Sequence, residues 1–375
     1  MLDAARSVRH YWPPRKAILS ALEAMSPSDT APVRPDEELD HAKLAAYLAG
    51  QLDHVIEPLA IRQFPGGHSN LTYLVVAGAT EYVLRRPPLG PVPPKAHDMA
   101  REYHVLSQIG PHFAPAPRVF LLCEDESVLG APFYLMERRQ GVVIRREVPS
   151  EIALCPGYAP RISETFIDRL AELHAIDIRR HGLEAIGRPE GFLRRQVRGW
   201  SGRWDRARTE PLAEMEALSE WLSRRMPASQ PATIVHNDYK LDNLMLDAAD
   251  PARVSAVLDW EMTTVGDPLV DLGIVLCYWS QADDPPMRRE AISPVTAQPG
   301  WYSRQELMQR YASTSGRDLT EIQYYEVFGL YKLAVVLQQI YYRFYVGQTS
   351  DHRFADFNQR VRGLAESAVL VMEAR

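Results

Sequence analysis

The stretch IVHNDYKLDN, Ile234 to Asn243, places a histidine, two aspartates, a lysine and two asparagines behind a short apolar run. Asp and Asn are common turn residues, but a solvated turn needs fewer hydrogen-bonding groups than this. The next strand-like run along the chain, VSAVLDW, carries Asp259 near its end. The two segments therefore place carboxylate and amide oxygens at the ends of predicted strands.

These side chains suit phosphoryl transfer from ATP. In that reaction a carboxylate orients the attacking hydroxyl and accepts its proton, and metal ions stabilise the spread negative charge. Mg²⁺ prefers hard oxygen ligands and keeps positions for phosphates and water. We interpret Asp238 as the base and Asn243 and Asp259 as magnesium ligands. Each alone would be better explained as a turn-capping residue, but the three together favour a catalytic site.

The residues around this stretch predict a small sheet-rich part and a larger, mostly helical part. Strand patterns precede residue 138, with helices predicted in AKLAAYLAGQL and AHDMAREYHVLSQI. In the later part, SETFIDRLAELHAIDIRRHG predicts a helix with Ser163 as N-cap and Gly182 as stop. We divide the chain into a linker (1–40), an N-lobe (41–137) and a C-lobe (138–375).

A glycine turn, FPGGHSN, joins two of the predicted strands. Gly66 and Gly67 would let the backbone approach nucleotide phosphates, and Ser69 and Asn70 belong to the same turn. An ordinary hairpin turn explains the segment equally well in isolation. Its position just before the strand YVLRR favours a phosphate-binding role.

Taken together, these motifs resemble the aminoglycoside phosphotransferase and choline kinase group. HNDYKLDN is similar to that group's H-G-D-x-x-x-x-N loop, and VLDWEMTTVGDPLVDLG is similar to its metal-aspartate segment. A closer resemblance, carried by VLRRPPLGPVPPKAHDMAREYHVL and YYEVFGLYKLAVVLQQIYYR, is to the kinase-like half of acyl-CoA dehydrogenase fusion proteins and their stand-alone bacterial relatives. The resemblance implies an α+β, protein-kinase-like fold of two lobes that uses ATP and Mg²⁺.

The resemblance also implies nucleotide-binding residues in the N-lobe. A strand lysine of the family, which pairs with phosphates and with a helix glutamate, corresponds here to Arg85, and the glutamate corresponds to Glu102. Arg86 would take this role if the register slipped by one residue. Arginine keeps the charge but not the compact geometry of an ammonium group. The backbone around Glu137 would bind adenine.

Other residues near the two motifs have two possible explanations each. Lys240 would either steady the transferred phosphate or form a fold-supporting ion pair. His236 and Asp267 are expected to organise the loops rather than to react. Lys332 and Arg343 of the predicted C-terminal helix would meet an anionic substrate, although a surface cation explains each more simply.

The composition limits the other classes of function. The 375 residues carry a net charge of −6, which argues against nucleic acid as a partner but is compatible with a local basic pocket. The three cysteines lack metal-ligand spacing, and we expect free, at least half-buried thiols. Neither a signal peptide nor an apolar run of membrane-spanning length is evident, so a cytoplasmic protein without a membrane partner is expected.

The predicted function is an ATP-dependent kinase acting on the hydroxyl of a small molecule. The closer resemblance implies a hydroxyacyl-CoA, specifically a 4-hydroxyacyl-CoA, or a related hydroxy acid. One alternative is a kinase of aminoglycosides, macrolides, choline or other amino alcohols, for which Asp283 and Asp284 in QADDPP would supply an acidic cleft. Another is a catalytically inactive, nucleotide-binding regulatory module, which Arg85 in place of lysine would favour.

Overall fold

The computed structural model describes residues 29–54, 56–65, 70–89 and 97–374. The chain divides into two compact units. The first comprises residues 1–100 and 120–138, and the second comprises residues 101–119 and 139–375. The predicted phosphate-turn residues Gly66, Gly67 and Ser69 lie outside the described residues, as does the segment before residue 29.

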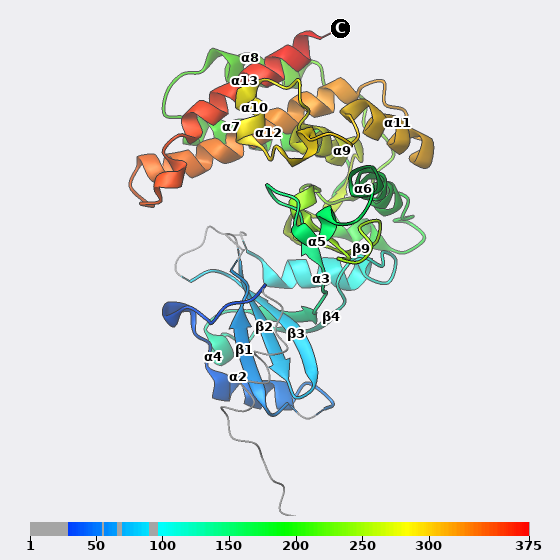
Figure 1. Cartoon of the computed structure of the whole chain (residues 1–375). Helices are drawn as coiled ribbons and strands as arrows, with labels where there is room; N and C mark the ends of the chain where they lie inside the picture. The colour runs from blue at the N-terminus through cyan, green and yellow to red at the C-terminus, as the bar shows by residue number, and fades with distance from the viewer. Residues whose placement is uncertain (1–28, 55, 66–69, 90–96, 375) are drawn as a thin grey trace, which may run out of the picture. The chain divides into compact units, whose positions relative to one another are not determined.

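The first unit is built on a five-stranded sheet with the order β1-β2-β3-β5-β4 (Figure 1). Antiparallel pairs join β1 to β2, β2 to β3 and β3 to β5. The strand bounds are β1 (Leu59–Gln63), β2 (Leu71–Ala77), β3 (Thr80–Arg86), β4 (Val119–Cys123) and β5 (Phe133–Glu137). These positions confirm the strands predicted from their β-branched and aromatic residues.

One face of this sheet carries the apolar core of the first unit. Two helices contribute to it, α2 (His41–Ala49) and α4 (Glu126–Leu129). The buried residues of this core include Leu44, Leu48, Tyr73, Leu84 and Leu129. The helix α2 is a predicted element, whereas α4, which lies between β4 and β5, was not predicted. Asp125 caps α4 by accepting the backbone N–H of Ser127 at 2.9 Å.

Residues 29–40, expected to form a linker, contact the sheet where they are described. Ala31 forms an isolated antiparallel bridge with Gln63 of β1. The Tyr73 hydroxyl donates to the carbonyl of Glu37 at 2.8 Å, and Arg138 pairs with Asp29 at 2.7 Å. A short 3₁₀ turn, η1 (Pro35–Glu37), lies in this segment.

The second unit is mostly helical, as predicted. The long helix α12 contacts α7, α8, α9 and α13, so it forms the centre of the helical part (Figure 1). The α-helices are α3 (Met99–Ile109, most of it in this unit), α5 (Ser150–Ala153), α6 (Tyr158–His174), α7 (Phe192–Ala207), α8 (Ala213–Arg224), α9 (Leu269–Tyr278), α10 (Pro286–Ala291), α11 (Arg304–Ser315), α12 (Ile322–Tyr345) and α13 (Phe357–Glu373).

Two small sheets of the second unit carry the motif segments. The pair β7–β10 and the three strands β6-β8-β9 are all antiparallel. Their bounds, with those of the 3₁₀ turns, are β6 (Val142–Val143), η2 (Leu183–Ile186), β7 (Thr233–Val235), η3 (Leu241–Asn243), β8 (Leu244–Leu246), β9 (Val254–Val257), η4 (Trp260–Met262), β10 (Thr264–Gly266), η5 (Val295–Ala297) and η6 (His352–Phe354). The strands predicted before and after the loop of Asp238 are present as β7 and β9, with the short β8 between them, and β7 pairs with β10.

The predicted ends of the helix around residue 163 are wrong. The helix α6 begins at Tyr158, so Ser163 lies inside it and is fully buried. Its hydroxyl donates to the carbonyl of Ala159 at 2.8 Å, the bond that a serine makes within a helix rather than at its start. The helix ends at His174, well before Gly182, which instead precedes η2 in a left-handed conformation with φ 68°.

Two expectations drawn from composition can be checked on the described residues. Cys123 and Cys277 are buried thiols and Cys155 is half-buried, so the prediction of free cysteines is confirmed. Among the helices of the described ranges, none combines the length and apolar character needed to cross a lipid bilayer.

Candidate active site

The segment around Asp238 is fixed at its start by a buried carboxylate, Asp271 of α9. This carboxylate accepts the backbone N–H of His236 at 2.6 Å and that of Asn237 at 2.7 Å. It also contacts Nε2 of His174 at 3.2 Å, and Nδ1 of His174 lies 2.7 Å from the Tyr311 hydroxyl. Asp271 is therefore the residue that ties the loop to the helical part, a role the sequence patterns did not assign.

The charge states of His174 and Asp271 follow from their burial and their contacts. Burial lowers the pKa of His174, so its ring is neutral and can donate through one nitrogen only. Burial alone would raise the pKa of Asp271, but its hydrogen bond with His174 and its other contacts hold that pKa below its usual range. An ionised Asp271 is thus the acceptor that the two backbone N–H groups require.

His236 makes the loop contacts expected of it, and Asn237 contributes to the shape of the loop as well. Burial lowers the pKa of His236, and its Nε2 lies 3.0 Å from the carbonyl of Leu258. Its Nδ1 accepts the backbone N–H of Asp238 at 3.3 Å. Asn237 has a φ of 63°, a left-handed conformation that asparagine tolerates better than most residues. These contacts connect the loop to the segment that carries Asp259.

Asp238, Lys240 and Asn243 form one connected group. Nζ of Lys240 lies 3.1 and 2.9 Å from the two carboxylate oxygens of Asp238. Nδ2 of Asn243 donates to the carbonyl and to Oδ2 of Asp238, each at 2.9 Å. The Asp238 side chain remains 19% exposed, which leaves it accessible to a substrate hydroxyl.

The Lys240 ammonium is charged in this position. Burial would lower its pKa, but charge interactions with Tyr278 and Asp238 outweigh burial and raise the pKa above its usual value. Burial raises the pKa of Tyr278, so its phenol is neutral near pH 7. The charge that stabilises the Lys240 ammonium at that pH is therefore the Asp238 carboxylate. Lys240 thus forms the predicted ion pair, and a role toward phosphate stays a prediction.

Asn243 and Asp259 lie at the same end of one strand pair. The strands β8 and β9 pair with Leu244 opposite Val257, and the backbone N–H of Leu258 donates to the Asn243 carbonyl at 2.8 Å. Asp259 follows with a φ of 67°, a left-handed conformation that is uncommon outside glycine and concentrates at functional sites.

The donor set of this strand end fits Mg²⁺. Because Nδ2 of Asn243 is engaged by Asp238, its Oδ1 is the atom left to act as a ligand. Together with the Asp259 carboxylate it would offer hard oxygens to a cation whose remaining ligands would come from phosphates and water. Within the described ranges no cluster of three or more His, Cys, Asp or Glu side chains could hold a metal by protein ligands alone.

Lys332 of α12 is buried, so its interpretation as a surface cation is wrong. Its Nζ donates to the carbonyl of Asn237, the residue before Asp238, and lies 5.5 Å from the Trp200 ring centroid. Burial lowers the pKa of Lys332, while Asp238 and Asp271 act in the opposite direction. Arg343, on the last turn of the same helix, is exposed.

Asp267 and Asp284 are both committed to protein contacts. Asp267 accepts the backbone N–H of Gln230 at 3.2 Å and the Tyr325 hydroxyl at 2.7 Å, which agrees with its expected role in organising the loop. Asp284 is 6% exposed and binds Arg304 through both carboxylate oxygens at 2.9 and 2.6 Å. Asp284 therefore does not supply the acidic cleft considered for a cationic substrate.

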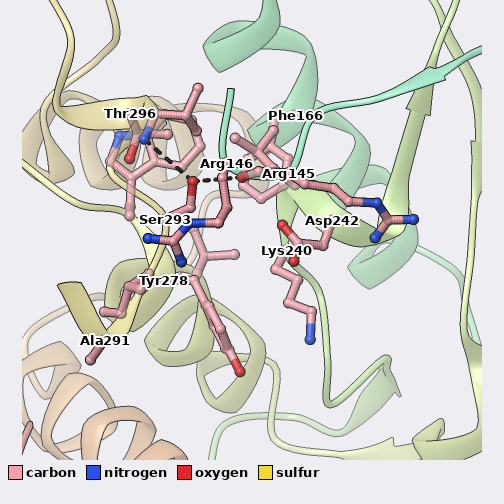
Figure 2. A pocket seen from close by; sticks show the side chains of 14 residues that line it. Arg145, Arg146, Phe166, Lys240, Asp242, Tyr278, Ala291, Ser293 and Thr296 are labelled. Atoms are coloured by element: carbon pink, nitrogen blue, oxygen red, sulfur yellow. Dashed lines mark hydrogen bonds between the residues drawn. The ribbon is translucent and has the colours of Figure 1, made fainter. Parts of the chain in front are cut away.

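A pocket of about 140 Å³ adjoins Lys240 within the second unit (Figure 2). Its charged lining residues are Lys240, Asp242, Arg145 and Arg146. Burial raises the pKa of Asp242, and the nearby cations act in the opposite direction. The pocket is thus richer in cations than in carboxylates, although the whole chain carries a net negative charge.

Arg86, the second of the two neighbouring strand arginines, is engaged on the core side of the sheet of the first unit. Successive strand residues point to opposite faces, so Arg86 shares the face of Leu84 and Arg85 does not. Arg86 is 6% exposed, and its Nη1 donates to the carbonyl of Leu129 at 3.0 Å. Arg86 is therefore part of the core side of the sheet, and the role of Arg85 toward the nucleotide stays a prediction.

The other predicted nucleotide-binding residues are placed as follows. Asn70 is buried, and its Oδ1 lies 2.8 Å from Nδ1 of His97. Burial, followed by the charge of Arg85, lowers the pKa of His97, which associates Arg85 with this part of the first unit. Glu137 ends β5, and Glu102 of α3 is 1% exposed. The pairing of Glu102 with Arg85 stays a prediction.

The sheet-based first unit, the helical second unit and the loop with its metal-compatible strand end define a kinase-like phosphotransferase. Residues 60–307 match the family described as "Phosphotransferase enzyme family". The chain belongs to this family, which confirms the predicted phosphotransferase class with a hydroxyl acceptor.

Individual relatives agree with this assignment. Over 91% of its length the chain is 32% identical to acyl-CoA dehydrogenase family member 10 of Mus musculus, of which it spans only 32%. It is 30% identical to a Ralstonia eutropha protein named provisionally as an aminoglycoside phosphotransferase, with a TM-score of 0.76, covering 90% of this chain and 100% of the other. The resemblance to the kinase-like half of the fusion proteins is confirmed.

A more distant solved structure shows the fold alone. A thermostable mutant of aminoglycoside phosphotransferase APH(4)-Ia, in a ternary complex with AMP-PNP and hygromycin B, is 17% identical to this chain with a TM-score of 0.56. The match covers 89% of this chain and 99% of the other. It supports the protein-kinase-like fold class predicted from the sequence.

Proposed function

We propose that this protein transfers the terminal phosphoryl group of ATP, with Mg²⁺, to the hydroxyl of a small molecule. The observation that carries the proposal is the connected group of Asp238, Lys240 and Asn243 beside the Asp259 strand end. The AMP-PNP complex of the APH(4)-Ia relative supports ATP as the donor. The complete group argues against an inactive nucleotide-binding module.

The residues have separate roles in the proposed reaction. Asp238 accepts a hydrogen bond from the acceptor hydroxyl and takes its proton as the oxygen attacks the phosphorus. Oδ1 of Asn243 and the carboxylate of Asp259 hold Mg²⁺, which neutralises charge on the phosphate oxygens when bound. Lys240 keeps Asp238 ionised and oriented through its ion pair. Arg85 of the first unit contacts the phosphate tail of the nucleotide.

For the acceptor we propose a hydroxyacyl-CoA or a related hydroxy acid. The matched relative from mouse is named for an acyl-CoA dehydrogenase, which supports an acyl substrate. An amino alcohol or aminoglycoside would require carboxylates near the loop. Of the two considered, Asp284 is buried in an ion pair with Arg304, whereas Asp283 is exposed. The cations that line the pocket beside Lys240 favour the hydroxyacyl acceptor over a cationic one.

A panel of acceptors read by coupled ADP release tests this proposal. With ATP and Mg²⁺ present, we expect turnover above the background ATPase rate with a 4-hydroxyacyl-CoA or the free 4-hydroxy acid. Choline, an aminoglycoside and a macrolide serve as comparison acceptors. Turnover confined to those comparison acceptors would refute the hydroxyacyl assignment while leaving the kinase itself in place.

A further inference from the structure

We propose that Arg145 and Arg146 form an anion-binding subsite that selects acceptors carrying a carboxylate or phosphate group apart from the reacting hydroxyl. This inference rests on the proposed kinase function and identifies the residues that would determine its specificity. The two arginines line the pocket beside Lys240. They belong to the segment between β6 and α5, which none of the motifs identified in the sequence includes.

The strand pairing directs this segment toward the catalytic loop. The strands β6 and β8 are antiparallel, with Val143 opposite Met245. If this antiparallel pairing continues, residues 144 and 145 lie near the first residue of β8, which directly follows Asn243. The strand β6 also contacts η3, which contains Asn243. The arginines thus closely follow β6, the strand that pairs with the strand leaving the loop.

The backbone of the segment is anchored by burial and by a hydrogen bond from Ser293. Ile144 is fully buried, and the Ser293 hydroxyl donates to the carbonyl of Arg145 at 2.5 Å. Ser293 in turn is tied to Ser280, whose hydroxyl donates to the Ser293 carbonyl at 2.8 Å. Figure 2 shows the bond between Ser293 and Arg145 as a dashed line beside the pocket. The arginines therefore extend from an anchored backbone rather than from a free loop.

The two guanidinium groups are available to a ligand. In Figure 2 the Arg146 group lies on the Ser293 side of the pocket and the Arg145 group lies on the Asp242 side. Both side chains are exposed, and within the described ranges neither guanidinium makes a hydrogen bond or a salt bridge. A guanidinium offers a planar array of donors that matches a carboxylate or a phosphate in a bidentate manner.

The charge balance of the pocket favours an anion. Lys240 is neutralised by its ion pair with Asp238, which leaves two arginines facing the single carboxylate of Asp242. A cationic acceptor would meet this net positive pocket at a cost, whereas an oxyanion would gain charge-assisted hydrogen bonds.

Ligand-observed NMR binding measurements test the subsite independently of catalysis. The probes are 4-hydroxypentanoate, its neutral amide, and the CoA and pantetheine thioesters of the same acid. The wild type should bind an anionic probe about tenfold more tightly than its neutral counterpart, and Arg146→Gln should remove most of that preference. Arg145→Gln should act in the same direction. Exposed Arg225, outside the pocket, provides the matched control Arg225→Gln.

The arms of the experiment separate the sources of the anion. A preference for 4-hydroxypentanoate over its amide assigns the subsite to a carboxylate, whereas a preference for the CoA over the pantetheine thioester assigns it to CoA phosphates. Equal binding of charged and neutral probes by the wild type would overturn the subsite. An effect of Arg146→Gln on ATP affinity alone would also overturn it.

The subsite and the proposed kinase function can fail separately. Binding of anionic probes that depends on Arg146, without any ADP formation, would leave the subsite in place and refute the kinase. Phosphoryl transfer whose rate depended neither on the charge of the acceptor nor on either arginine would support the kinase function and refute the subsite.

Discussion

At the scale of single residues, buried charges hold the candidate catalytic loop from beneath. Asp271 accepts the backbone N–H groups of His236 and Asn237. Lys332 donates to the backbone carbonyl of Asn237, the residue before Asp238. The desolvation of a carboxylate and an ammonium is costly unless each is hydrogen-bonded. Both are bonded here to the loop backbone, so their charges fix the peptide that carries Asp238.

Replacement of Lys332 by methionine tests this support. The variant keeps most of the side-chain volume but leaves the Asn237 carbonyl without its donor, so the peptide before Asp238 can shift. Because small displacements of a reacting group can cost up to about 100-fold in rate, we expect kcat to fall roughly 10- to 100-fold with little change in the KM for ATP. Steady-state ADP release measures both constants.

Arg343→Met provides the control for that variant, because Arg343 is an exposed cation on the same helix. It should keep the wild-type kcat. A Lys332→Met enzyme with an unchanged kcat would show that the buried ammonium does not position the loop. A parallel loss of kcat and of cooperative unfolding would instead indicate a general role in stability.

Sequence spacing could predict only the local part of this arrangement. Asp238, Lys240 and Asn243 lie within a few residues of one another, and their contacts follow from one tight loop. The bond from Asn237 to Asp271 joins residues 34 apart, and that from Lys332 to Asn237 joins residues 95 apart. Such contacts depend on how helices pack, which a pattern of side chains does not reveal.

At the scale of elements, the close approach of α9 and α12 sets the position of Asp271. A Cβ atom added to Gly273 of α9 would lie 2.2 Å from the carbonyl oxygen of Tyr325 on α12. One added to Gly329 of α12 would lie 2.6 Å from the carbonyl oxygen of Gly273. Two glycines therefore allow the helix backbones to touch, and Asp271 lies on α9 two residues before the first of them.

Gly273→Ala should consequently destabilise the protein. The methyl group would meet backbone atoms that cannot rotate away, so we expect a loss of about 1–3 kcal/mol in the free energy of unfolding, as for other overpacked sites. Urea denaturation measures it. Gly202→Ala in α7 is the matched control, because its Cβ would meet only the end of the Arg206 side chain at 3.3 Å.

The control should stabilise α7 by about 0.5–1 kcal/mol, since alanine is favoured over glycine inside a helix. If Gly273→Ala were as stable as the wild type, the two helices would not be in backbone contact. A loss of stability in both variants would indicate a general intolerance of added methyl groups rather than this contact.

The apolar periodicity of the sequence predicted most helices and strands. It did not predict features that depend on contacts with other elements. The strands of the first unit and the helices α2, α8 and α12 follow their apolar patterns. Ser163, expected as an N-cap, satisfies its hydroxyl on the preceding turn, so nothing local distinguished the start of α6. The pairing of β7 with β10 passes over β8 and β9 and has no signature in the strand sequences.

At the scale of the whole molecule, the net charge of the chain does not predict the charge of the candidate site. The chain carries a net charge of −6, yet cations predominate in the pocket beside Lys240. The net charge argues against nucleic acid as the main partner but gives no information on the acceptor. The proposed acceptor rests instead on the pairing of Asp284 with Arg304 and on Arg145 and Arg146, which make no salt bridge within the described residues.

The central claim is that Asp238 serves as the base of an ATP- and Mg²⁺-dependent phosphoryl transfer. The most direct test compares ADP formation by the wild type and by Asp238→Asn with a 4-hydroxyacyl-CoA acceptor. An amide cannot accept the hydroxyl proton, so the rate should fall about 10²- to 10⁴-fold, while ATP binding persists. Exposed Asp205 supplies the control Asp205→Asn, which should retain full activity. An Asp238→Asn enzyme that turned over within a few-fold of the wild type would contradict the account.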